Sequence, residues 1–336
     1  MYTRSMRSVI LILAIAFLLP LTGSAQIFSD LGVGDLSSFS VSATPQYPAP
    51  YGTVTLSFLS SSLDLANATL GVSVNGKSIY QGSVRPVAVT LGKAGSVTNV
   101  VATVSVSGAE YTQELSIQPQ DIALVVEPIA SVPPLYPGKS SVPPEGSVRV
   151  VAMANLKNAN GVSLNPSVLS YSWTVSGARI ANASGIGKTT ILVASPLQYR
   201  ARDISVAIMS TDGSQVGGAF ISITAAEPSV RIYENDSLLG IRFDRALAGE
   251  YAIAGAESTL YAAPFSFPTT QGAPLLQWFL NGASAQTGNS ITLRPTGDGQ
   301  GSASLSVVAS AGDYTTAMAN LSLSFGDKPS TNFFGL

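Results

Sequence analysis

The sequence predicts an all-β protein built from three tandem β-sandwiches that follow a secretory signal peptide. Past residue 38 the chain consists of short alternating apolar and polar runs, broken by Gly, Pro, Asn and Asp, and helical periodicity is nearly absent. One strand-and-turn unit recurs three times. A chain of 336 residues is long enough for two or three domains that each bury a core.

Residues 1–25 have the features of an export signal. Arg4 and Arg7 supply a positive end, residues 9–21 form an apolar stretch, and Gly23-Ser24-Ala25 is a small-residue cleavage site before Gln26. Because an apolar stretch of this length falls short of the ~20 residues that span a bilayer, we expect cleavage, with a retained anchor as the alternative. No Cys is present to carry a lipid. The predicted location is extracellular, at the cell surface or in the extracytoplasmic envelope.

The repeat is clearest around the two tryptophans. Tyr171–Gly177 matches Leu276–Gly282 at an offset of 105 residues, and Leu70–Gly76 has the same spacing. Apolar residues at alternate positions that end in Asn-Gly or Ser-Gly predict an inward-packing strand followed by a sharp turn. We therefore expect three residues at the same position of each copy to mark the cores: Val72, Trp173 and Trp278.

Each copy continues with a hairpin turn and a closing strand. The turns are expected at Gly108, Gly213 and Gly312, and the closing strands at 115–117, 221–223 and 321–323. Repeats of this length indicate sandwiches, since solenoid units run ~20 to 50 residues. The predicted division is an N-terminal segment 26–38, domains at 39–120, 121–226 and 227–325, and a tail at 326–336. The links at 118–121 and 225–228 are short, which predicts limited bending.

The aromatic-x-Trp-x-apolar-x-Gly strand, the hairpin and the tandem layout resemble bacterial Ig-like and PKD-like surface modules over residues 39–325. The whole chain resembles secreted Ig-like proteins of small-genome candidate-phylum bacteria (Patescibacteria-type), through Val126-Glu127-Pro128, the run 133–139 and the run 233–240. These resemblances imply surface contact, and they carry over no assigned activity. The Trp-Asp-Phe-Gly-Asp-Gly run of PKD domains is missing, and an Ig disulfide cannot form without Cys, so the strand topology stays open.

Composition excludes most catalytic classes. The chain contains no His and no Cys, which removes Ser-His-Asp and Cys-His nucleophilic sites and the usual zinc ligands. Charged residues make up 11% of the chain and the net charge is -2, so nucleic acid, which needs clustered Lys and Arg, is not an expected partner. A paired-carboxylate glycosidase remains formally open, although the 19 acids are scattered. We expect no enzyme activity and no cofactor.

Two local motifs suggest ligands but are better explained by turns. Residues 184–190 end like a phosphate-binding loop, yet Asn182 occupies the position of its first Gly and a strand-like run follows, so nucleotide is not expected. Acidic residues at 234–236 and 297–299 lack the spacing of a dedicated calcium loop, and solvated turn acids are the favoured interpretation. No metal site is predicted.

Aromatic residues in predicted loops are the candidates for partner contact, with junction packing as the equal alternative. They are Tyr47, Tyr51, Tyr136, Tyr199, Phe265 and Phe267. The tail adds Phe333 and Phe334, as a docking motif for an assembly or membrane or as a frayed end. We therefore predict an exported, non-catalytic structural or adhesive protein that contacts proteins of the surface or envelope, such as a pilus or other assembly. The alternative is a carbohydrate-binding surface protein that uses loop aromatics.

Overall fold

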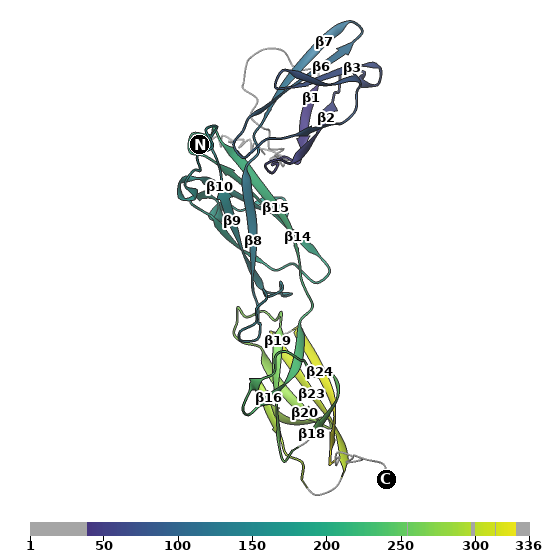
Figure 1. The fold of residues 1–336 in the computed structure, drawn as a ribbon, viewed down its shortest axis with the longest axis vertical. Coiled ribbons are helices and arrows are strands. Elements are labelled where there is room, and N and C mark those ends of the chain that lie inside the picture. The colour runs from purple at the N-terminus through teal and green to yellow at the C-terminus, as the bar shows by residue number, and fades with distance from the viewer. Residues whose placement is uncertain (1–38, 254, 297–299, 313, 327–336) are drawn as a thin grey trace, which may run out of the picture. The chain divides into compact units, whose positions relative to one another are not determined.

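The computed structural model describes residues 39–253, 255–296, 300–312 and 314–326 (Figure 1). The signal segment, the segment 26–38, most of the tail with Phe333 and Phe334, and the acidic run 297–299 lie outside the described residues. Within the described ranges the chain forms strands and three short 3-10 turns, at Leu65–Asn67, Pro166–Val168 and Ala181–Ala183. No helix in these ranges has the length and apolar character needed to cross a bilayer. The all-β prediction is confirmed.

The strands form six sheets, which pair around three separate clusters of buried residues. In the first sandwich, three strands face four. One sheet has the order β1-β2-β5, and the other has the order β4-β3-β6-β7. Their bounds are β1 Ser40–Thr44, β2 Thr53–Leu59, β3 Thr69–Val74, β4 Lys77–Ser83, β5 Val87–Thr90, β6 Thr98–Val106 and β7 Ala109–Ile117. All pairings in it are antiparallel, as expected of an Ig-like sandwich.

The second sandwich repeats this division. The sheet β13-β9-β8 packs with the sheet β11-β10-β14-β15, and the short strand β12 pairs with β10. The bounds are β8 Asp121–Ile129, β9 Ser147–Asn155, β10 Ser170–Val175, β11 Ala178–Arg179, β12 Gly185–Ile186, β13 Thr190–Ala194, β14 Ala201–Met209 and β15 Val216–Thr224. In β9, β10 and β14 alternate residues are buried, which is the period-two pattern of the sequence.

The third sandwich differs at one edge of each sheet, because β17 extends one sheet and β18 extends the other. Its sheets are β17-β16-β19-β22 and β18-β24-β23-β20-β21, and β18 runs parallel to β24, which gives that edge an extra strand. The bounds are β16 Ser229–Asp236, β17 Gly240–Ile241, β18 Gly249–Ile253, β19 Ser258–Phe265, β20 Leu275–Leu280, β21 Ala283–Thr287, β22 Ser290–Leu293, β23 Gly301–Ala311 and β24 Thr315–Phe325. The topology that the sequence left open is therefore not the same in all three copies.

The tryptophans occupy the same place in the second and third cores. Trp173 in β10 and Trp278 in β20 are fully buried, and Val72 in β3 is buried at the matching place in the first core. The indole Nε1 of Trp173 donates to the Lys188 carbonyl at 2.8 Å, and that of Trp278 donates to the Gly288 carbonyl at 2.9 Å. Each acceptor lies two residues before a strand of the opposite sheet. Each indole thus links the two sheets of its sandwich by a hydrogen bond. One of the two acceptors, Lys188, lies in the run 184–190 that resembles a phosphate-binding loop.

The sharp turns predicted after these strands are present. The pairs Asn75-Gly76, Ser176-Gly177 and Asn281-Gly282 have φ of 47° to 50° at the first position and 78° to 82° at the second, as type I′ turns require. Asn75 Oδ1 also accepts the Asn99 amide at 2.9 Å, which links the turn to the neighbouring strand. Small polar residues therefore hold the left-handed positions of all three hairpins.

The link between the first and second sandwiches is hydrogen-bonded rather than free. Gln120 is buried, and its amide donates to the Lys157 carbonyl at 3.0 Å while its Oε1 accepts the Lys157 amide at 2.9 Å. The half-buried ring of Tyr47 lies over Gly218 of β15, where an added Cβ would press against the ring and lie 2.7 Å from the Val206 carbonyl oxygen. Glycine at this strand position admits the aromatic ring.

Candidate functional site

The long loop between β8 and β9, residues 130–146, lies along the third sandwich, and we call it the proline loop. The Ser131 amide donates to the Phe267 carbonyl at 2.8 Å, and the Ser266 amide donates to the Ser131 carbonyl at 3.0 Å. Ser131 Oγ accepts the Phe267 amide at 3.1 Å, and Ala130 forms a β-bridge with Pro268. This short ladder fixes the start of the loop against the end of β19.

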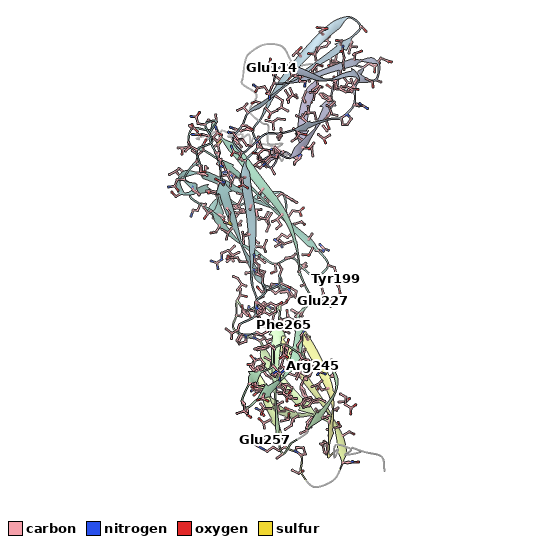
Figure 2. The ribbon with its side chains drawn as sticks, in the orientation of Figure 1. Glu114, Tyr199, Glu227, Arg245, Glu257 and Phe265 are labelled. Carbon is pink, nitrogen blue, oxygen red and sulfur yellow. The ribbon has the colours of Figure 1, made fainter. Side chains whose placement is uncertain are left out.

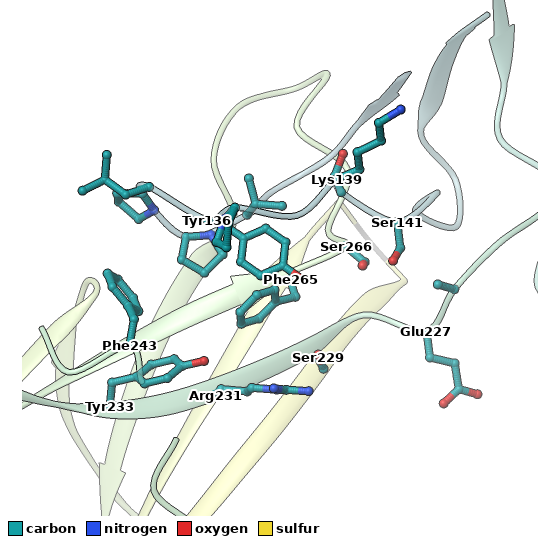
Figure 3. A pocket seen from close by; sticks show the side chains of 17 residues that line it. Tyr136, Lys139, Ser141, Glu227, Ser229, Arg231, Tyr233, Phe243, Phe265 and Ser266 are labelled. Atoms are coloured by element: carbon teal, nitrogen blue, oxygen red, sulfur yellow. The ribbon is translucent and has the colours of Figure 1, made fainter. Parts of the chain in front are cut away.

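A groove of about 450 Å³ lies between the proline loop and the outer face of β16 and β19, and we call it the junction groove (Figure 3). Tyr136 from the loop meets Phe265 from β19 edge to face, with ring centroids 5.6 Å apart. The Arg231 guanidinium lies 5.4 Å from the centre of the Phe265 ring, within cation–π range. The wall of the groove is thus a stack of one cation and two aromatic rings.

A second aromatic cluster forms the floor. Phe243 packs edge to face between Tyr233 and Tyr261, with centroids 5.2 Å and 6.0 Å away. Tyr233 is buried, and burial raises the pKa of Tyr261 above its ordinary value. Because edge-to-face rings of this kind contribute beyond their buried area, packing against Tyr261 stabilises the floor, which Tyr233 and Phe243 line.

The charged residues around the groove differ in whether they have a polar partner within the described chain. Lys139 and Arg231 make no ion pair within the described residues, and both are exposed. The Glu227 carboxylate accepts the Tyr199 hydroxyl at 2.9 Å and the Gln198 amide at 3.2 Å. The hydrogen bond from the Tyr199 hydroxyl to Glu227 is the larger cause of a raised Tyr199 pKa, and the negative charge of Glu227 is the next. Figure 2 labels Tyr199 and Glu227. Glu227 also lines the groove, which therefore carries two cations and one carboxylate.

The structure separates the aromatic residues singled out from sequence. Tyr136 and Phe265 meet in the groove, Tyr199 bonds to the second link, and Tyr47 packs at the first link. Tyr51 is 73% exposed.

Phe267 requires a correction. It is completely buried in the third core, although it follows the end of β19, because the ladder with Ser131 turns its side chain inward. It therefore offers no surface to a partner.

Several groove residues were not identified from sequence. Arg231 and Tyr233 lie on alternating positions of β16, and Phe243 lies in the loop after β17. The outer face of a strand gives no local signal that a loop from another sandwich will cover it. Leu135, at the tip of the proline loop, is 98% exposed and is the most exposed large apolar side chain described.

Two acids of the described chain, Asp212 and Asp236, hold turns. Asp212 Oδ1 accepts the Ser210 hydroxyl and the Ser214 amide, and these hydrogen bonds lower its pKa. Asp236 Oδ1 accepts two backbone amides, which also lower its pKa. A general acid needs the opposite shift, since it must keep its proton near neutral pH. No group of three metal-ligating side chains occurs within the described ranges.

No family model matches the chain, and no curated protein matches it. Among solved structures, it is similar to three N-terminal domains of the Highly Immunogenic Outer Capsid protein of bacteriophage RB49, with 11% identity over 86% of this chain and 98% of that one, at a TM-score of 0.23. It is also similar to the central fibronectin-III array of RIM-binding protein (8% identity, 86% and 96% covered, TM-score 0.29). A third similar structure is that of Sidekick-1 immunoglobulin domains 1–4, with 13% identity over 87% of this chain and 75% of that one, at a TM-score of 0.20. Identities and scores this low do not bear on partners or activity.

Proposed function

We propose that this protein is an exported, non-catalytic structural or adhesive protein of the cell surface or envelope, and that the junction groove is a site of protein contact. The observation that carries the proposal is the groove itself, with its aromatic wall and floor, two cations that make no ion pair with any described residue, and an almost fully exposed leucine at its edge. Protein interfaces are enriched in Tyr, Phe and Arg and bury aromatic anchors in such recesses.

Export follows from the leader and not from the folded domains. Gly23-Ser24-Ala25 predicts cleavage before Gln26. N-terminal sequencing of the protein in the extracytoplasmic fraction should begin at Gln26. Recovery of the intact leader in a soluble cytoplasmic fraction would contradict export.

Contact at the groove can be tested on intact cells. A photo-crosslinking amino acid at Leu135 should give a covalent adduct with a protein. The matched control is the same crosslinker at Leu192 of β13, also an exposed leucine but on the second sandwich, and it should give none. Equal adduct formation from both positions, or none from Leu135, would contradict a contact site at the groove.

Carbohydrate binding is the second candidate, and the exposure of Tyr51 and Tyr199, at 73% and 87%, favours it. Exposed aromatic faces can stack on the apolar faces of sugars. Binding on a glycan array that Tyr51→Ala or Tyr199→Ala abolishes would support this reading. If Tyr136→Ala also abolished it, the groove would be the sugar site.

A further inference from the structure

Leu135 has a backbone conformation that its side chain does not explain. Pro133 to Tyr136 form a β-turn, in which the Tyr136 amide donates to the Pro133 carbonyl at 3.2 Å. Leu135 is third in this turn at φ 61°, a left-handed position that favours Gly or Asn. A bulky residue there is strained, and such strain is kept where it serves a function. Because the side chain is 98% exposed, packing within the chain does not account for leucine.

Two other turns share this construction. The Gly52 amide donates to the Ala49 carbonyl, and the Arg200 amide donates to the Leu197 carbonyl, both at 3.0 Å. The third residues are Tyr51 at φ 58° and Tyr199 at φ 61°, and both are mostly exposed. The hairpins, by contrast, use Asn or Ser and Gly at their left-handed positions. Three turns of the described chain therefore place a large, exposed side chain at a left-handed third position, and Leu135 is one of them.

A second apolar projection lies on the same sandwich as the groove. The turn between β16 and β17, residues 236–240, carries Leu238 and Leu239, which are 92% and 71% exposed, and we call it the leucine tip. Asp236 Oδ1 accepts the Leu238 amide at 2.8 Å and the Leu239 amide at 2.9 Å. This cap fixes the backbone of both leucines before any contact, which reduces the backbone entropy lost on binding.

The leucine tip and the junction groove are complementary in chemistry. The groove offers aromatic rings with Lys139 and Arg231 as two cations free of ion pairs within the described chain, against the single carboxylate of Glu227. The tip offers two leucines beside Asp236, while the nearby Arg242 is paired with Asp244 at 3.1 Å. With 11% charged residues and a net charge of -2, two copies of the chain repel one another only weakly.

Both patches belong to the third sandwich, since β16 forms part of the groove and leads directly into the tip. One copy therefore carries both halves of the contact. A pairing of two copies about a two-fold axis uses each half twice and closes on itself. We propose that the leucine tip of one copy docks in the junction groove of a second copy, and reciprocally, to form a dimer. This rests on the proposed function of the groove as a protein contact site.

Sedimentation velocity of the chain from Gln26 onward, from about 1 to 100 μM, tests the proposal. We expect a concentration-dependent dimer. The double variant Leu238→Ser and Leu239→Ser should raise the dissociation constant at least tenfold, because it removes both apolar side chains without adding a charge that the groove's cations would attract. The control Leu192→Ser changes an exposed leucine of the second sandwich and should leave the dissociation constant unchanged. A chain that stays monomeric throughout, or a control that weakens association equally, overturns the proposal.

Two further variants separate docking from folding. Leu135→Gly should weaken the dimer without lowering the melting temperature, because glycine adopts the left-handed position without strain. Arg231→Glu should weaken the dimer by placing an acid opposite Asp236. A mixture of the Arg231→Glu chain with the leucine-tip variant keeps one intact contact out of two, so it should associate more tightly than either variant alone. No gain on mixing refutes the reciprocal arrangement.

The two proposals can fail separately. If a crosslinker at Leu135 captures a different protein while the purified chain stays monomeric, the groove is a contact site and the dimer is wrong. If it captures nothing and the chain is monomeric, both are wrong. An adduct of twice the chain mass, lost with the leucine-tip variant, supports both.

Discussion

Replacement of Trp173 by Ala should unfold the second sandwich selectively. Trp173 is the largest fully buried side chain of that core, and truncation of a buried Trp typically costs about 3 to 5 kcal/mol. The change also removes the indole donor of the Lys188 carbonyl, a hydrogen bond that contributes about 0.5 to 1.5 kcal/mol net. Against a domain stability of about 5 to 15 kcal/mol, this loss is large.

The assay uses the fact that the chain contains only two Trp residues. In Trp173→Ala, Trp278 is the sole indole, so its fluorescence in a urea titration reports the third sandwich alone. Calorimetry should show the transition of the second sandwich lowered by roughly 12 to 24 °C for a 3 kcal/mol loss. The Trp278 midpoint should fall by much less, because the two cores share no residue and the third sandwich loses only the contacts of the proline loop.

Trp173→Phe separates the two contributions. Phenylalanine keeps much of the ring volume but cannot donate to the Lys188 carbonyl, so we expect a smaller loss of about 1 to 2 kcal/mol. Unchanged calorimetric transitions in Trp173→Ala would refute the structural role of this residue. An equal fall in the Trp278 midpoint would refute the view that each sandwich is stabilised by its own core.

Three other changes test separate contacts. Gly218→Ala should displace Tyr47 and expose the first link to limited proteolysis without lowering the melting temperature of the third sandwich; unaltered cleavage would contradict the packing. Asn281→Ala should destabilise only the third sandwich, by about 1 to 2 kcal/mol in a denaturant titration. Alanine tolerates the left-handed φ less well than asparagine, and it leaves the Ser304 amide without its side-chain acceptor. Because the pKa of Asp236 is lowered from 3.8, its cap is complete above that pH and is lost as pH falls through the lowered value. The protection of the tip amides against exchange, relative to the intrinsic rate at each pH, should therefore fall only in that acid range.

The sequence alone was sufficient for the features that depend on local pattern. Alternation with period two placed Val72, Trp173 and Trp278 inward, because successive side chains of a strand point to opposite faces. The Asn-Gly and Ser-Gly pairs predicted the tight hairpins, because few residues tolerate a positive φ.

The candidate site depended on contacts between distant segments. Ser131 and Phe267 are 136 residues apart, and their hydrogen bonds bury Phe267 and bring Tyr136 onto Phe265. Strand periodicity says which side chains share a face, but it says nothing about which loop will cover that face. Only the tertiary structure decided that a loop from the second sandwich lies along β16 and β19, and that Leu135 at its tip stays exposed.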